Sequence, residues 1–222
     1  TIQAVANDFL IPGYQTINTL TLRLWSSEYN NQYENNSKNL AQLTESIYPS
    51  DSDDENVISM RLKQEYFLSS ASVQDIVLRL KYEQHASIHD LPKFISIHIN
   101  DTQPCLMALE LLRILIDDEK MEFDEAFSIV KQSFSFTCQT LIPMTFERFP
   151  LPIFEKILPR HLLLIYEINE RTLSQVHDNS YKTDMSIIEE SNPKQIRMIN
   201  LAIICSHNVI GVSKSQTNML TE

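Results

Sequence analysis

Glycine is almost absent from this sequence, which contains two glycines in 222 residues, Gly13 and Gly211. Loops that bind phosphate groups need several glycines close together, because backbone N–H groups must approach the anion without intervening side chains. Neither glycine has such neighbours. The sequence therefore excludes a glycine-rich nucleotide-binding loop.

Basic residues and long apolar runs are also scarce. The chain has 18 Lys and Arg against 29 Asp and Glu, which gives a formal net charge of −11. Neutralising the phosphates of nucleic acid needs clustered Lys and Arg, so we expect no nucleic-acid partner. No apolar run has the length of a membrane span, and no N-terminal signal pattern is present, so we expect no membrane partner.

Cysteine and histidine are too few, or too poorly arranged, for a disulfide framework or a metal site. Cys105, Cys138 and Cys205 are an odd number in apolar surroundings, which predicts reduced core thiols and a cytoplasmic location. His85 and His89 are four residues apart and could share a helix face. Because the sequence offers them no third ligand of known spacing, we expect no metal.

The chain is rich enough in apolar residues, at 43% hydrophobic, to bury one sizeable core. Residues 30–60 begin with a segment rich in Asn, Ser, Asp and Glu, which predicts a mobile polar connector around one short helix. Apolar spacing predicts a helix over Arg61–Tyr82, a strand over Phe94–Ile99 and a helix opened by Pro104. Further helices are predicted near 124–134, 151–157, 160–176 and 193–207. Strands that feed helices repeatedly indicate an α/β layered domain.

Seven short segments carry a further signal through their order and near-collinear spacing. They are IPGY (11–14), TLRLWS (21–26), RLKQEYF (61–67), INDTQP (99–104), ERFP (147–150), LPRHLLLIYEINER (158–171) and SHNVIGV (206–212). Together they resemble the α-1,4-glucan phosphorylases, the family of glycogen and starch phosphorylase, from about Gln3 to the last residue. The resemblance implies that residues 1–222 are part of the N-terminal domain, a doubly wound Rossmann-like domain of a two-domain glycosyltransferase-B type enzyme.

The resemblance also implies a reaction and a cofactor. Family enzymes use inorganic phosphate to release glucose 1-phosphate from an α-1,4-glucan such as glycogen, with pyridoxal phosphate bound to a lysine of the C-terminal domain. That lysine lies beyond Glu222. We therefore expect this chain to bind no pyridoxal phosphate and to be inactive alone.

Four residues match substrate-cleft positions of the family: Asp101, Gln103, Gln139 and Val212. The family has His where this sequence has Gln103 and Gln139, and Glu where it has Met144. Gln can still donate and accept hydrogen bonds, whereas Met144 cannot replace a carboxylate. Simpler roles are also open, because Asp101 follows a predicted strand as a turn and cap residue would, and Val212 could be plain packing.

A second glucan site of the family, a storage site away from catalysis, is matched by Tyr166, Asn169, Glu190 and Lys194. The first two are predicted on one helix and the last two at the start of the next. Tyr, Asn, Glu and Lys supply the amphipathic face and the donors and acceptors that sugars need. The alternative is an ordinary solvated helix face with Glu167 and Arg171 as an i,i+4 pair.

Regulatory features of the family are reduced in this sequence. Arg79 is what is left of a pair of arginines that binds a nucleotide effector in animal enzymes, and the polar connector lacks much of a helix that couples two subunits. Both effector control and the family's dimer are therefore in doubt. Three interpretations stay open: an enzyme with altered tuning, a non-catalytic glucan-binding or regulatory pseudoenzyme, and a decayed gene product without a stable fold.

Overall fold

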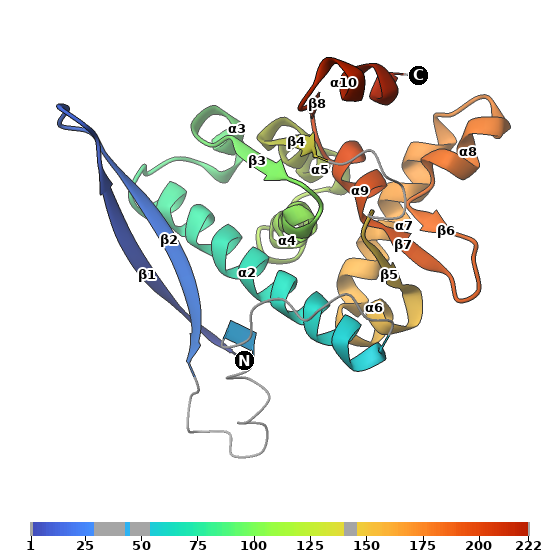
Figure 1. The fold of residues 1–222 in the computed structure, drawn as a ribbon, viewed down its shortest axis with the longest axis horizontal. Coiled ribbons are helices and arrows are strands. Elements are labelled where there is room, and N and C mark those ends of the chain that lie inside the picture. The colour runs from blue at the N-terminus through green and yellow to red at the C-terminus, as the bar shows by residue number, and fades with distance from the viewer. Residues whose placement is uncertain (1, 29–42, 45–53, 140–145, 222) are drawn as a thin grey trace.

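The computed structural model describes residues 2–28, 43–44, 54–139 and 146–221 (Figure 1). Within them, a parallel sheet has the strand order β3 (Ile97–Asn100), β4 (Phe134–Cys138) and β8 (Asn208–Gly211). The connection from β3 to β4 passes through the short 3-10 helix η2 (Gln103–Cys105), the helix α4 (Leu106–Arg113), the π-helical turn η3 (Ile114–Asp118) and the helix α5 (Phe123–Ser133). A parallel sheet with helical crossovers confirms the predicted α/β class.

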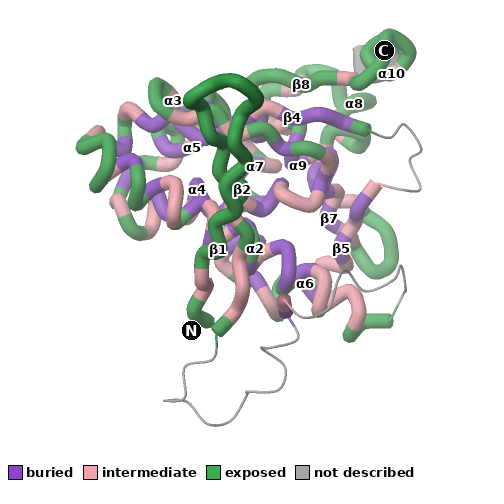
Figure 2. The backbone as a smooth tube through the Cα atoms, turned by 60° about the vertical axis from the view of Figure 1, so that its left-hand side comes forward, coloured by how far each residue is buried: buried purple, intermediate pink, exposed green. Residues whose placement is uncertain are grey.

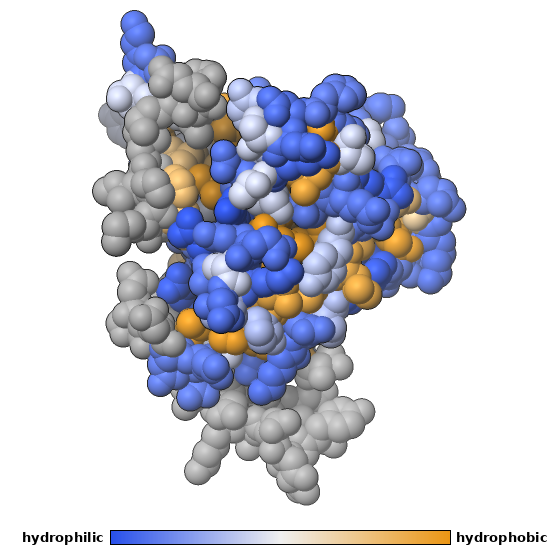
Figure 3. Space-filling model, turned by 90° about the vertical axis from the view of Figure 1, so that its right-hand side faces the viewer, coloured by the Kyte–Doolittle hydropathy of each residue, from blue (hydrophilic) through white to orange (hydrophobic). Residues whose placement is uncertain are grey.

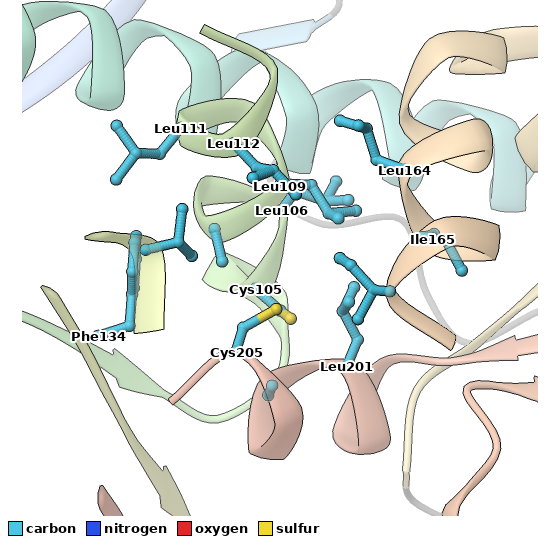
Figure 4. Close-up of a cluster of buried hydrophobic side chains, with 14 of the residues drawn as sticks. Cys105, Leu106, Leu109, Leu111, Leu112, Phe134, Leu164, Ile165, Leu201 and Cys205 are labelled. Atoms are coloured by element: carbon cyan, nitrogen blue, oxygen red, sulfur yellow. The ribbon is translucent and has the colours of Figure 1, made fainter. Parts of the chain in front are cut away.

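The core surrounds α4, which lies between α2 (Glu55–Tyr82) and α7 (Pro159–Ser174) (Figure 1). The side chains of Leu106, Leu109 and Leu112 on α4 are at most 1% exposed. Figure 4 shows them packed beside Leu164 and Ile165 of α7. Both predicted long helices, Arg61–Tyr82 and 160–176, are confirmed, because each has an apolar stripe at helical spacing that this core buries.

Several predicted boundaries were wrong where distant segments meet. Phe94 ends the helix α3 (Leu91–Phe94), which follows the 3-10 helix η1 (Ile88–Asp90), so the strand begins at Ile97 and not at Phe94. The predicted helix 193–207 begins instead as the strand β7 (Gln195–Arg197), and only α9 (Met198–Ile204) is helical. Ile196 of β7 is fully buried between Phe149 and Ile188 on neighbouring strands, a pairing that local spacing cannot reveal.

That small antiparallel sheet joins β5 (Arg148–Pro150), β7 and β6 (Ile188–Glu189). The helix α6 (Leu151–Ile157) follows β5, and α8 (Asn179–Met185) lies between α7 and β6. The final described helix is α10 (Lys214–Thr221), directly after β8. This sheet and α8 form the right-hand side of Figure 1.

A long antiparallel hairpin, which the sequence analysis did not predict, makes up the start of the chain. It consists of β1 (Gln3–Pro12) and β2 (Thr19–Glu28), and its tip extends beyond the body of the molecule (Figure 1). At the tip, the N–H of Gly13 donates to the carbonyl of Asn18 at 2.9 Å. A Cβ atom at Gly13 would lie 2.3 Å from Cγ2 of Thr16 and 3.0 Å from the carbonyl oxygen of Asn18, so a larger residue there would force the Thr16 side chain to move.

The polar stretch 30–60 ends earlier than predicted, because α2 begins at Glu55 with the Asp54 side chain accepting from the N–H of Asn56 at 2.7 Å. Most of the rest of the predicted connector lies outside the described residues, as does Met144. The three cysteines are free and buried, as predicted. In the described part of the chain, no helix is long and apolar enough to cross a membrane.

Candidate functional site

The strands of the parallel sheet end side by side, and predicted cleft residues follow each of them. Asn100 at the end of β3 pairs with Thr137, and Cys138 at the end of β4 pairs with Gly211 of β8. Asp101, Gln139 and Val212 come directly after these three strands. Open α/β sheets bind ligands at the carboxyl ends of their strands. We call this place the sheet edge.

Asp101 turns the chain out of β3 in an uncommon backbone conformation. Its φ is +66°, in the left-handed region, which Asp tolerates better than most residues. Its N–H donates to the carbonyl of Thr137 at 3.0 Å, and its Oδ1 accepts from the N–H of Thr102 at 3.1 Å. Asp101 is thus the turn residue that the sequence predicted. It is not the helix cap, since Thr102 occupies that position of η2 and makes no capping bond through its side chain.

Gln139 and Gln103 differ in their surroundings. The exposed Gln139 side chain donates from Nε2 to Oδ1 of Asn100 at 2.5 Å, which joins the ends of β3 and β4. The half-buried Gln103 lines a small hollow of about 190 Å³ with residues of α2 and α4, among them Leu68 and Met107. Val212 is 57% exposed. The structure therefore brings Asp101, Gln139 and Val212 to the sheet edge, and it places Gln103 beside α2.

A buried carboxylate behind this edge was not predicted as a site residue. The Glu147 side chain is 3% exposed, and its Oε1 accepts from Arg61 Nη2 at 2.8 Å. Its Oε2 accepts from the Thr102 hydroxyl at 3.3 Å, next to Asp101. Arg61, Thr102 and Glu147 come from the segments RLKQEYF, INDTQP and ERFP, respectively. The presence of all three segments in one sequence was the available signal, but it did not indicate that these three residues contact one another.

A second buried network joins α4 to its neighbours through Glu110. Its carboxylate accepts from His161 Nε2 at 2.8 Å, Arg113 Nε at 3.0 Å and Ser70 Oγ at 2.9 Å. The Tyr66 hydroxyl adds a longer bond at 3.3 Å. Burial alone would raise the pKa of Glu110, but the hydrogen bonds from His161 and Arg113 outweigh it and lower the pKa to about 2. Sequence reasoning missed this carboxylate within an apolar helix.

The storage-like residues are only partly assembled as predicted. Glu190 and Lys194 do not begin a helix; they lie between β6 and β7, where Lys194 Nζ is 2.7 Å from Glu190 Oε2. The hydrogen bond to Glu190 raises the pKa of Lys194. The Tyr166 ring on α7 is 42% exposed.

Asn169 has a structural role at this surface. Its Oδ1 accepts from the N–H of Ile187 at 2.7 Å and from the Ser186 hydroxyl at 3.3 Å, which ties α7 to the start of β6. The predicted pair of Glu167 and Arg171 is confirmed, with Nε to Oε1 at 2.5 Å. The side of the molecule that carries α8 and β6 is mainly hydrophilic, with narrower apolar bands (Figure 3). Tyr166, Glu190 and Lys194 are the accessible residues of this predicted site.

Arg79 lies on the last turns of α2, and its Nε is 3.2 Å from Glu83 Oε2 at the surface. It lines a hollow of about 420 Å³ with residues of α2 and of the segment 94–96. In the described ranges, no three His, Cys, Asp or Glu side chains are grouped as metal ligands would be. His89 contacts Glu125 at 2.7 Å, and His98 contacts Thr137 at 2.5 Å.

Comparison with known proteins places these features in a family. The sequence profile of the family Phosphorylase, described as carbohydrate phosphorylase, matches residues 1–222. The chain is 39% identical to the glycogen phosphorylase of Haemophilus influenzae over 99% of its length and 29% of the relative's length. It is 40% identical to glycogen phosphorylase 2 of Dictyostelium discoideum over 95% of its length and 23% of the relative's.

The brain form of glycogen phosphorylase from Bos taurus gives 36% identity over the whole chain and 29% of the relative's length. The chain thus spans under a third of the length of the relatives it matches. Because the family profile matches residues 1–222, the chain belongs to the carbohydrate phosphorylase family.

Proposed function

We propose that residues 1–222 are part of the N-terminal domain of a glycogen phosphorylase homologue and form one wall of its α-1,4-glucan cleft. The observation that carries this proposal is the position of Asp101, Gln139 and Val212 after the carboxyl ends of three neighbouring parallel strands. We further propose that these strands belong to a doubly wound, Rossmann-like domain, since ligands bind such domains at this edge. The family suggests a cytoplasmic protein.

The sheet edge suits binding of a sugar. The Asp101 carboxylate can accept hydrogen bonds from hydroxyl groups, and the Gln139 carboxamide can both donate and accept. Val212 offers an apolar surface to a sugar ring, and the buried Glu147 fixes Thr102 beside Asp101. The edge would therefore bind and orient a glucan in front of a reaction centre completed by another domain.

Pyridoxal phosphate, which the family implies, does not fit these residues. A site for it needs a lysine amine and donors that hold its phosphate. Asp101, Gln139 and Val212 supply a carboxylate, a carboxamide and an apolar side chain. We therefore expect the chain alone to release no glucose 1-phosphate from glycogen and phosphate.

A non-catalytic glucan-binding role is the second candidate, and the storage-like surface favours it. Tyr166 on α7 is exposed, Asn169 ties α7 to the start of β6, and the exposed pair of Lys194 and Glu190 follows β6. Aromatic faces with nearby donors and acceptors are suited to sugars. This surface requires neither the sheet edge nor a cofactor.

Electrophoresis of the 222-residue chain through gels with and without glycogen tests the storage-like surface, and an assay for glucose 1-phosphate tests whether the chain is inactive alone. We expect glycogen to retard the chain, and Tyr166→Ala to weaken binding about fivefold through loss of roughly 1 kcal/mol of ring contact. Tyr181→Ala is the matched control, because Tyr181 is an exposed tyrosine on α8. Equal retardation of wild type and Tyr166→Ala would exclude the storage-like surface, and release of glucose 1-phosphate by the chain would exclude the view that it is inactive alone.

A further inference from the structure

The hairpin of β1 and β2, which we call the arm, has two different faces. Residues directly opposite each other in an antiparallel ladder lie on the same face. Arg23 and Trp25 belong to the inner face and contact α2: Arg23 Nη1 is 2.7 Å from Asp75 Oδ1, and Trp25 Nε1 donates to Ser72 Oγ at 3.0 Å. The inner face is therefore attached to α2 at Arg23 and Trp25.

The opposite face, the outer face, is apolar and exposed. Its register pairs Phe9 with Leu22, Ile11 with Leu20, and Asn7 with Leu24. The five apolar side chains among these are between 48% and 72% exposed. Figure 2 shows exposed residues along most of the arm, with partly buried ones toward its base. Such a contiguous apolar stripe on a soluble protein marks a surface that binds polypeptide or another apolar partner.

The size of the outer face argues against a second copy as the partner. Strands of ten residues are about 33 Å long, and two of them are about 10 Å wide, so the face offers about 300 Å². A stable, specific dimer buries about 800 Å² on each partner. Two arms stacked face to face reach less than half of that, and each copy carries a net charge of −11.

We propose instead that the outer face is the docking surface for polypeptide of the same phosphorylase fold that lies outside these 222 residues. The Haemophilus influenzae relative matches 99% of this chain, so the match includes nearly all of the arm, yet this is 29% of that relative's length. In this relative, the segment that matches the arm is therefore part of a chain more than three times as long as these 222 residues. The occupant is a β-structured segment, because among the described residues no further strand pairs with β1, which leaves room for one along it.

A chimera tests this proposal, which rests on family membership and not on glucan binding. The matching region of the Haemophilus influenzae glycogen phosphorylase is replaced by these 222 residues, and the triple substitution Phe9→Ser, Leu22→Ser and Leu24→Ser is made in the chimera and in the isolated chain. We expect the triple change to lower the melting temperature of the chimera by about 5 °C or more and that of the isolated chain by about 1 °C or less.

The matched control is Leu10→Ser, because Leu10 is 70% exposed but belongs to the inner face. We expect it to leave both melting temperatures nearly unchanged. An equal fall in the chimera and the isolated chain for the triple change would overturn the proposal. Sedimentation of the isolated chain is a second measurement that needs no chimera: a monomer supports the proposal, and a dimer that the triple change dissociates would show that a second copy is the partner.

Discussion

Replacing Glu110 by glutamine tests whether a single buried carboxylate holds α2, α4 and α7 together. The folded-state pKa of about 2, against an ordinary value of 4.5, corresponds to about 3 kcal/mol of stability at neutral pH. Because the folded-state pKa is the lower one, this contribution is complete well above pH 4.5 and is lost as the pH falls toward 2. More than half of it is gone at pH 3. Gln keeps the shape but leaves Arg113 and His161 facing a neutral group.

Urea unfolding at pH 7 and pH 3 measures this contribution. We expect Glu110→Gln to lower the free energy of unfolding by about 3 kcal/mol at pH 7 and by about 1 kcal/mol at pH 3. Glu167→Gln is the control, because it breaks an exposed pair with Arg171 and should cost less than about 0.5 kcal/mol at pH 7. A loss for Glu110→Gln that is the same at both pH values would refute the reasoning.

Two further predictions concern other buried groups. Burial raises the pKa of the Cys105 and Cys205 thiols, that of Cys205 to about 12, so a thiol reagent at pH 8 should label them only as fast as the chain unfolds; labelling within seconds in native buffer would contradict this. Glu147→Gln removes the charge that Arg61 faces and should lower the free energy of unfolding in urea by about 2 kcal/mol, while Glu125→Gln, at an exposed carboxylate, should change it by less than about 0.5 kcal/mol.

The local spacing of apolar residues was sufficient to predict the elements in which buried residues recur at a regular interval. The helices α2 and α7 were predicted because one face of each carries apolar residues at helical spacing. The arm was missed because Phe9, Leu10 and Ile11 put apolar residues on both of its faces, which hides the alternation of a strand. The boundary near Ile196 depends on strand pairing with Phe149, 47 positions away, and no local pattern encodes it.

The candidate site also contains some residues that the sequence predicted and others that it did not. Asp101, Gln139 and Val212 were predicted through resemblance to a family, and the parallel register is what brings them together. The sequence did not reveal the partners of Glu147, because Arg61 lies 86 positions away. Buried ion pairs of this kind connect residues that are distant in the sequence, so a carboxylate within an apolar segment signals that a partner exists without naming it.

The length of α2 has a mechanical consequence for the molecule. Arg23 and Trp25 of the arm hold this helix at Asp75 and Ser72, and Glu147 holds it at Arg61. At 1.5 Å per residue, these two attachments are about 20 Å apart on one unbroken helix. A continuous α-helix of this length behaves as a rigid rod, so the arm and the ion pair behind Asp101 cannot shift independently along its axis. A polypeptide that seats on the arm would therefore also set the position of the sheet edge.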